Sequence, residues 1–284
     1  MRRILIGAFS IILLLAVLLI SYYRAGVVSK DSIGKQIRQS AVSPKKTPQK
    51  PIVVSDEVYQ KYELIKEIPV LMYHEVGKPR GRWPQLYVDP VVLAEQLDWL
   101  NNNGYSTISL EDMYEHWKNK KILPAKPVVL TFDDGYRSAY SIVFPLLRDR
   151  NMTATFFPFP TMFNKPDGLT PVMIREMAGK GMEIGGHGYT HADLDKIPET
   201  EFARELGESK ALIEKITRRP VRFLCYPTGR YNKTVMEAVR KYGYLAAVTM
   251  HSGRAAVDQD LYELRRIGIY NRDNLKLFAE KLKQ

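Results

Sequence analysis

The chain has 284 residues, 45% hydrophobic and 26% charged, a composition that excludes a wholly disordered or fibrous protein. A formal net charge of +11 suits anionic partners, but no basic stretch is interleaved with aromatic residues, so we expect no nucleic acid binding. The single cysteine, Cys225, excludes an intrachain disulfide and a cysteine-based zinc finger.

The first residues predict a membrane segment. Two arginines precede an apolar run from Ile4 to Ile20, and two tyrosines follow it. As a helix this run would extend about 26 Å, close to the thickness of the apolar part of a bilayer. We therefore expect an uncleaved signal-anchor over residues 1–24, making a single-pass membrane protein whose remaining chain is extracytoplasmic. The alternative is a cleaved signal peptide, which would give a secreted protein.

Residues 25–66 predict an extracytoplasmic linker. Proline, lysine, serine and glutamine are frequent there and large apolar residues are few before Ile52, so the segment cannot bury a core. Residues 67–284 are long enough to form one catalytic domain with a sizeable core.

From Ile68 onward, short apolar runs alternate with stretches of helical spacing. The expected strands are Pro69–Tyr73, Ser106–Ile108, Pro127–Phe132, Ala154–Pro158, Glu183–Gly185, Phe223–Tyr226, Ala246–Thr249 and Leu264–Ile267. The expected helices are Pro90–Asn102, Leu110–Lys118, Ser138–Arg150, Thr170–Lys180, Thr200–Thr217, Lys233–Tyr242 and Asn274–Lys283. This alternation predicts an α/β fold with a parallel sheet, closed or open, and in barrels of this kind the chemistry lies at the carboxyl ends of the strands.

Polar or turn residues follow four of these strands. They are His74-Glu75, Asp133-Asp134-Gly135, His187 with His191, and Tyr226-Pro227-Thr228-Gly229. Two adjacent carboxylates at the end of a buried strand are costly unless a cation binds there. We therefore expect these groups to meet at one end of the sheet.

Two histidines and one carboxylate form a common open zinc site, in which water takes the remaining position. A second carboxylate can accept a proton from that water, and a further histidine can protonate the leaving group. The pattern predicts metal-assisted hydrolysis of an amide or an ester. Taken alone, Asp-Asp-Gly is also typical of a turn, and a single His-x-x-x-His can be accidental. His116, in a polar helical stretch, is expected on the surface, and His251 at the rim.

Two motifs carry a family resemblance. Residues 131–135 (Thr-Phe-Asp-Asp-Gly) and 187–191 (His-Gly-Tyr-Thr-His) resemble the first and second motifs of the polysaccharide deacetylase family, carbohydrate esterase family 4 or the NodB homology domain. The resemblance covers about Ile68 to Tyr270 and implies a distorted (β/α)7 barrel. It implies Asp133 as the general base and a divalent metal held by Asp134, His187 and His191. Zinc is the expected ion, with cobalt or nickel as alternatives.

The family's third motif, Arg-x-Pro-Tyr, is altered here to Cys-Tyr-Pro-Thr at residues 225–228. The resemblance implies that the Thr228 backbone N–H stabilises the oxyanion of the tetrahedral intermediate, with Tyr226 and Pro227 beside it. Cys225 stands where the family has the arginine that holds the base, and Arg265 or Arg266 is the expected substitute.

The family's fifth motif, Leu-x-His near the C-terminus, is absent, and residues 69–74 end in His74 before the first motif. This arrangement is similar to the permuted family members that deacetylate poly-N-acetylglucosamine. It implies His74 as the general acid.

The resemblance therefore implies removal of N-acetyl groups from N-acetylglucosamine residues of a polysaccharide. The positive charge suits peptidoglycan, whereas the His74 motif suits poly-N-acetylglucosamine. Trp83, in a predicted loop, is the expected sugar-stacking residue. Two alternatives remain open: a polysaccharide O-acetyl esterase, and an inactive carbohydrate-binding relic of the same barrel.

Overall fold

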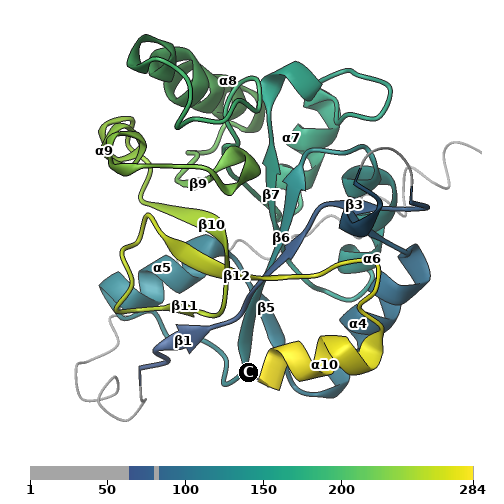
Figure 1. Ribbon diagram of the computed structural model, residues 1–284. Coiled ribbons are helices and arrows are strands. Elements are labelled where there is room, and N and C mark those ends of the chain that lie inside the picture. The colour runs from purple at the N-terminus through teal and green to yellow at the C-terminus, as the bar shows by residue number, and fades with distance from the viewer. Residues whose placement is uncertain (1–63, 80–82, 284) are drawn as a thin grey trace, which may run out of the picture. The chain divides into compact units, whose positions relative to one another are not determined.

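The computed structural model describes residues 64–79 and 83–283 (Figure 1). The expected membrane segment and nearly all of the expected linker lie outside these residues. In the described part of the chain, no helix is long and apolar enough to cross a membrane. We therefore correct the expectation of a single-pass membrane protein, because no described helix supports it.

A curled parallel sheet forms the centre of the fold. Its strands are β2 (Val70–Tyr73), β5 (Ser106–Ile108), β6 (Pro127–Asp134), β7 (Thr155–Pro158), β8 (Glu183–Ile184), β9 (Phe223–Cys225), β10 (Ala246–Ser252) and β12 (Leu264–Gly268). The order is β8-β7-β6-β2-β12-β10-β9, and β5 pairs with the first residues of β6. A parallel bridge from Gly186 to Leu224 links the two ends of this order. The predicted α/β fold is confirmed, and the curled sheet matches a distorted (β/α)7 barrel.

Two short strand pairs were not expected. Antiparallel β1 (Glu67–Ile68) pairs with β11 (Ala255–Ala256), and parallel β3 (Glu75–Val76) pairs with β4 (Tyr87–Val88). Strands of two residues are too short to produce a readable alternation of apolar and polar residues.

The helices are α4 (Pro90–Asn102), α5 (Leu110–Asn119), α6 (Phe144–Arg148), α7 (Pro171–Gly179), α8 (Ser209–Thr217), α9 (Lys233–Lys241) and α10 (Leu275–Lys283). Three of these helices begin directly after a capping residue. The side chains of Asp89, Thr170 and Asn232 each accept a hydrogen bond from a backbone N–H group in the first turn of the helix that follows. The C-terminal α10 packs on α4 (Figure 1). Between them the Phe278 ring meets the Trp99 ring edge-on.

Two of the expected helices are interrupted. The stretch 138–150 divides into a π-helical turn, η2 (Ala139–Val143), and α6, and Pro145 near the start of α6 has no N–H to continue an α-helical ladder. The stretch 200–217 divides into the 3-10 turn η4 (Glu199–Glu201), the π-helical η5 (Ala203–Glu208) and α8. Short 3-10 turns also occur at η1 (Pro84–Leu86), η3 (Pro160–Met162) and η6 (Pro227–Gly229).

Successive side chains along a strand point to opposite faces of the sheet, and this alternation produces two separate apolar clusters. One packs the sheet against the helices and contains Leu71, Leu130 and Phe156. The other contains Val129, Cys225, Val248 and Leu264, which come from four different strands. Because Val129 and Asp133 are four residues apart on β6, they share a face, so Asp133 continues the second cluster toward the carboxyl end of the strands.

Candidate active site

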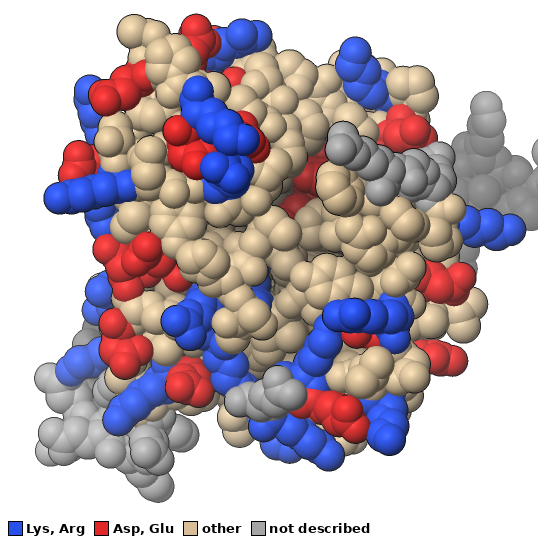
Figure 2. Space-filling view, viewed as in Figure 1, with Lys and Arg blue, Asp and Glu red and all other residues tan. Residues whose placement is uncertain are grey.

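Asp134, the last residue of β6, converges with His187 and His191, which follow β8. The Nε2 atoms of both histidines lie 3.2 Å from Oδ1 of Asp134, and one ligand atom of each residue lies within 4.8 Å of the others. Nδ1 of His187 lies 2.7 Å from the Cys225 carbonyl oxygen, which can only accept, so Nδ1 carries the proton and Nε2 presents its lone pair. Figure 2 shows acidic atoms recessed beside the ends of β6 and β7.

The donor set fits a divalent metal. Asp134 and His191 both have positive φ, 70° and 65°, a strained conformation for residues with a side chain. Burial alone would raise the pKa of Asp134, but the contacts with the His187 and His191 imidazoles hold that pKa well below its ordinary value. An ionised carboxylate and two imidazoles aimed at one point are the ligands that zinc takes in open sites.

Sequence reasoning missed the residues that support the second-motif loop. Buried Glu205, in η5, accepts hydrogen bonds from the backbone N–H groups of Tyr189 and Thr190 at 2.7 and 3.0 Å and from the Thr190 hydroxyl at 2.7 Å. The Ser209 hydroxyl donates to the Gly188 carbonyl at 2.6 Å. Glu205 and Ser209 are polar residues at helical spacing within an apolar face, and that interruption is the signal in the sequence.

Gly188 is required by this packing. Its φ is +70°, and a Cβ there would lie 2.9 Å from Oε2 of Glu205 and 3.3 Å from Cγ of Pro227. The second- and third-motif loops therefore pack directly on each other.

Asp133 is buried and paired with Arg266. The Arg266 guanidinium donates to both Asp133 carboxylate oxygens, and its other bonds go to the Thr131 hydroxyl, the Thr249 carbonyl and the Cys225 sulfur. Burial alone would raise the pKa of Asp133, but the Arg266 charge outweighs this and lowers it below its ordinary value. Burial also raises the pKa of the Cys225 thiol, which stays neutral.

His74 lies at the end of β2, with Nε2 3.9 Å from Oδ2 of Asp133. Its Nδ1 is buried and has no hydrogen-bond partner among the described residues. Burial is the main cause that lowers the pKa of His74, against the opposing charge of Asp133. The structure thus brings His74 to the same end of the sheet as the two aspartates.

The third motif forms η6. Thr228 has a φ of 56°, and its hydroxyl donates to Asp193 at 2.6 Å. The Tyr226 side chain is buried, and its hydroxyl donates to the Tyr262 carbonyl at 3.0 Å, while Pro227 is buried as well. In this motif the backbone, rather than the Tyr226 phenol, is the part available to a substrate.

Trp83 was expected in a loop and His116 on the surface, and the two residues differ in their exposure. Trp83 is 55% exposed at the start of η1, as a loop-borne sugar contact requires. The expectation that His116 lies on the surface is wrong. His116 is buried, and its Nε2 accepts from the backbone N–H of Ile65, which fixes the chain entering the domain.

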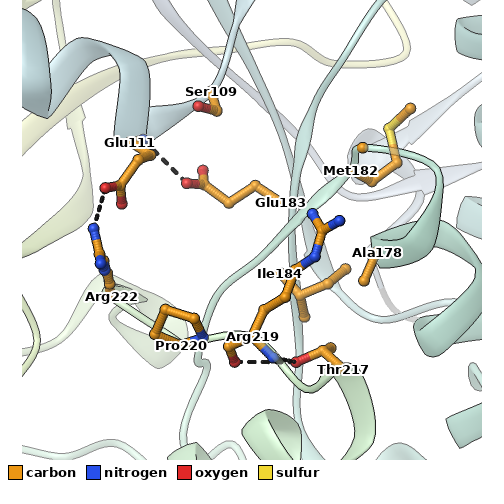
Figure 3. Close-up of a pocket in the computed structure, with 11 residues that line it drawn as sticks. Ser109, Glu111, Ala178, Met182, Glu183, Ile184, Thr217, Arg219, Pro220 and Arg222 are labelled. Atoms are coloured by element: carbon orange, nitrogen blue, oxygen red, sulfur yellow. Dashed lines mark hydrogen bonds and ion pairs between the residues drawn. The ribbon is translucent and has the colours of Figure 1, made fainter. Parts of the chain in front are cut away.

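A cavity of about 340 Å³ lies at the opposite end of the sheet, beside the starts of β8 and β9 (Figure 3). There Glu183 points toward the start of α5, where the backbone N–H groups of Leu110 and Glu111 donate to it at 2.9 and 3.0 Å. Arg222 forms an ion pair with Glu111. These contacts join the starts of β8 and β9 to the start of α5.

Comparison with known proteins identifies the family. Residues 120–247 match the family model described as polysaccharide deacetylase. YxkH of Bacillus subtilis, named as a candidate polysaccharide deacetylase, is 31% identical over 209 residues, which are 74% of each chain. The chain belongs to the polysaccharide deacetylase family. The resemblance inferred from the motifs is confirmed.

Solved structures and further relatives indicate the branch. The Streptococcus pyogenes deacetylase PplD, solved in complex with acetate, superposes with a TM-score of 0.72 at 26% identity, covering 77% of this chain and 99% of that one. IcaB from Ammonifex degensii gives 0.66 at 25% identity, covering 77% and 98%. The poly-β-1,6-N-acetyl-D-glucosamine N-deacetylase of Escherichia coli is 30% identical over 256 residues, and the match covers 75% of this chain but 38% of that protein. These relatives match the permuted branch.

Proposed function

We propose that this polysaccharide deacetylase is a metal-dependent hydrolase that removes N-acetyl groups from N-acetylglucosamine residues of a cell-wall or extracellular polysaccharide. One observation carries the proposal: Asp133, held by the buried Arg266, stands next to the convergent Asp134, His187 and His191. A fixed carboxylate beside an open metal site is the arrangement needed for hydrolysis by an activated water.

Asp134, His187 and His191 would hold the metal, zinc by preference with cobalt or nickel as alternatives. When bound, the metal supplies a Lewis acid and lowers the pKa of a coordinated water. The Cys225 carbonyl keeps the His187 Nε2 lone pair aimed at the site, and Glu205 keeps the loop that carries His191 in place.

Asp133 acts as the general base. Its pKa is held below the ordinary value, so it is ionised at neutral pH and can accept a proton from the attacking water. The two hydrogen bonds from Arg266 fix both carboxylate oxygens, so proton transfer needs no reorientation of the side chain.

The remaining roles fall to His74 and Thr228. His74, 3.9 Å from Asp133, protonates the departing amine of the sugar. The Thr228 backbone N–H, with Tyr226 and Pro227 shaping the loop, donates to the oxyanion that develops on the acetyl carbonyl oxygen. Trp83 provides a stacking surface for the polymer.

Relatives support two substrate classes, peptidoglycan and poly-N-acetylglucosamine. Proteins of Escherichia coli and Staphylococcus epidermidis named as poly-β-1,6-N-acetyl-D-glucosamine N-deacetylases match 75% and 62% of this chain. The Bacillus subtilis protein PdaA, named as a peptidoglycan-N-acetylmuramic acid deacetylase, matches 42% of it at 31% identity.

The test is acetate release from N-acetylglucosamine oligomers by the full chain, purified without chelator, together with elemental analysis of bound metal. We expect release that EDTA stops and that zinc or cobalt restores. Release from acetylated xylan with none from N-acetylglucosamine oligomers would favour the O-acetyl esterase. Neither metal nor acetate release from any substrate would favour the carbohydrate-binding relic.

A further inference from the structure

A cavity of about 270 Å³ opens at the carboxyl ends of β10 and β12, the same end of the sheet as the aspartates. Four of the residues that line it are basic, and none is acidic. The basic residues are Arg254, Arg266, Arg272 and Lys281. Figure 2 shows lysine and arginine atoms in the region where Figure 1 draws α10 and the segment that precedes it.

An irregular strand pairing creates the opening. Val248 pairs with Leu264, but the next pair joins Ser252 to Arg266, so β10 has more residues than β12 over the same interval. The end of β10 therefore bulges, and Gly268 on the other side leaves room for the Tyr270 hydroxyl, which occupies the place of a Cβ.

The positive charge of this cavity is only partly neutralised. Arg266 is paired with Asp133, and Lys281 with Asp273. Arg254 donates to the Leu282 carbonyl, which holds its side chain without cancelling its charge, and Arg272 is exposed. Neither Arg254 nor Arg272 forms an ion pair with another described residue.

The cavity adjoins the candidate active site. Arg266 lines the cavity and also holds Asp133. Gly268, another lining residue, pairs with Met72, two residues before His74. A group bound in the cavity would therefore lie beside Arg266, the residue that holds Asp133.

We infer that this cavity is a subsite for an anionic substituent of the polysaccharide, a carboxylate or a phosphate, with Arg254 and Arg272 as its recognition residues. The inference rests on the proposed function and narrows it to anionic polymers. Guanidinium groups bind carboxylate and phosphate through paired, charge-assisted hydrogen bonds, and two unpaired guanidiniums at one cavity favour such a ligand over a neutral sugar.

The test compares the full-length protein with the double variant R254Q/R272Q and with the control R148Q/R219Q, which removes the same charge from exposed positions outside the cavity. The substrates are oligomers of matched length: neutral N-acetylglucosamine, a glycan strand alternating N-acetylglucosamine with muramic acid, its carboxyl-methyl ester, and an N-acetylglucosamine oligomer carrying a phosphate. Acetate release and, by calorimetry, binding are measured for each.

We expect kcat/KM of wild type and of the control to be about tenfold higher on the free acid than on its ester. The difference should arise from a lower KM for the free acid, and added salt should reduce it. R254Q/R272Q should lose this preference and keep its rate on the neutral oligomer. A larger preference for the phosphate-bearing oligomer would identify phosphate as the ligand. Equal rates on acid and ester in wild type, or an equal loss on all substrates in the double variant, would overturn the inference.

The binding measurement separates this inference from the proposed function. Acetate release from none of the glycans would contradict the proposed function, whereas charge-dependent binding that is lost in R254Q/R272Q would still support the subsite. Release without any charge preference would support the function and remove the subsite.

Discussion

Arg266 donates hydrogen bonds to both carboxylate oxygens of Asp133, at 2.8 and 2.7 Å, across a separation of 133 residues in the sequence. The same guanidinium lies 3.1 Å from the Cys225 sulfur. Cys225 occupies the position at which the third motif of the family has arginine. Here the guanidinium beside Asp133 comes instead from Arg266 on β12.

The first prediction concerns this pair. Arg266→Gln should lower kcat by about 100-fold or more while metal stays bound, because Asp133 loses the groups that orient it. Arg266 lowers the pKa of Asp133, so its loss should raise that pKa and move the acidic limb of the pH–rate profile to higher pH. The measurement is kcat/KM against pH. The control is Arg265→Gln, which changes the exposed neighbour of Arg266. An identical shift of the pH–rate profile in Arg265→Gln would contradict the prediction.

The second prediction separates the two adjacent aspartates. Asp133→Asn should retain stoichiometric metal and lose turnover by about 10² to 10⁴-fold, as expected for removal of a general base. Asp134→Ala should lose the metal itself, because it removes the only carboxylate among the three convergent groups. Elemental analysis and acetate release on the same samples decide the matter, and metal retained by Asp134→Ala would refute the ligand assignment.

Local patterns were sufficient to predict much of the fold and the grouping of the polar residues. Asp133 and Asp134 end β6 and His74 directly follows β2, and strand ends are readable from short apolar runs. The position of Arg266 was less accessible because two arginines are adjacent on β12. Only the alternation from buried Leu264, once the strand is known, shows that Arg266 points inward and Arg265 outward.

Contacts between distant segments could not be read from local patterns. His116 has polar neighbours in the sequence, yet it is buried because the backbone of Ile65 covers it. Glu205 points to the second-motif loop from a π-helical turn, whereas the spacing of apolar residues over 200–217 predicts one continuous helix. In both cases the environment of the side chain is set by a residue that is distant in the sequence. Helix propensity and apolar periodicity describe only neighbouring residues, so they cannot predict such a contact.

The third prediction tests Glu205. Glu205→Ala should weaken metal affinity by about 10- to 100-fold, since the loop between His187 and His191 loses three hydrogen bonds. Turnover should recover at saturating metal because no reacting group is removed. Glu208→Ala, an exposed change in the same π-helical turn, is the control. Unchanged metal affinity in a folded Glu205→Ala protein would show that the loop holds its shape without this carboxylate.

The fourth prediction concerns Glu183 (Figure 3). Burial raises its pKa to about 7, above the ordinary value of a carboxyl group. A raised pKa in the folded state means that stability is greatest at low pH and falls as pH rises through about 7. Wild type should therefore lose on the order of 1–3 kcal/mol of unfolding free energy between pH 5 and pH 8 relative to Glu183→Gln. Chemical denaturation at both pH values measures this difference.

For Glu183→Gln the difference in slope is the readout, because the amide also loses hydrogen-bond acceptors at the start of α5 and lowers stability at every pH. Metal content and turnover of the folded protein should be unchanged, since the Glu183 carboxylate bonds to the start of α5 and to Thr155 rather than to the candidate ligands or Asp133. Parallel stability curves for the two proteins would contradict a raised pKa for Glu183.

The last prediction addresses His74. His74→Gln should slow turnover by about 10² to 10⁴-fold with metal still bound, because the departing amine loses its proton donor. An N-acetylglucosamine derivative with a better leaving group should restore much of the rate, since such a group departs without protonation. His251→Gln, an exposed change at the end of β10, should have little effect on either substrate. Equal losses on both substrates in His74→Gln would mean that His74 positions Asp133, 3.9 Å away, rather than supplying a proton.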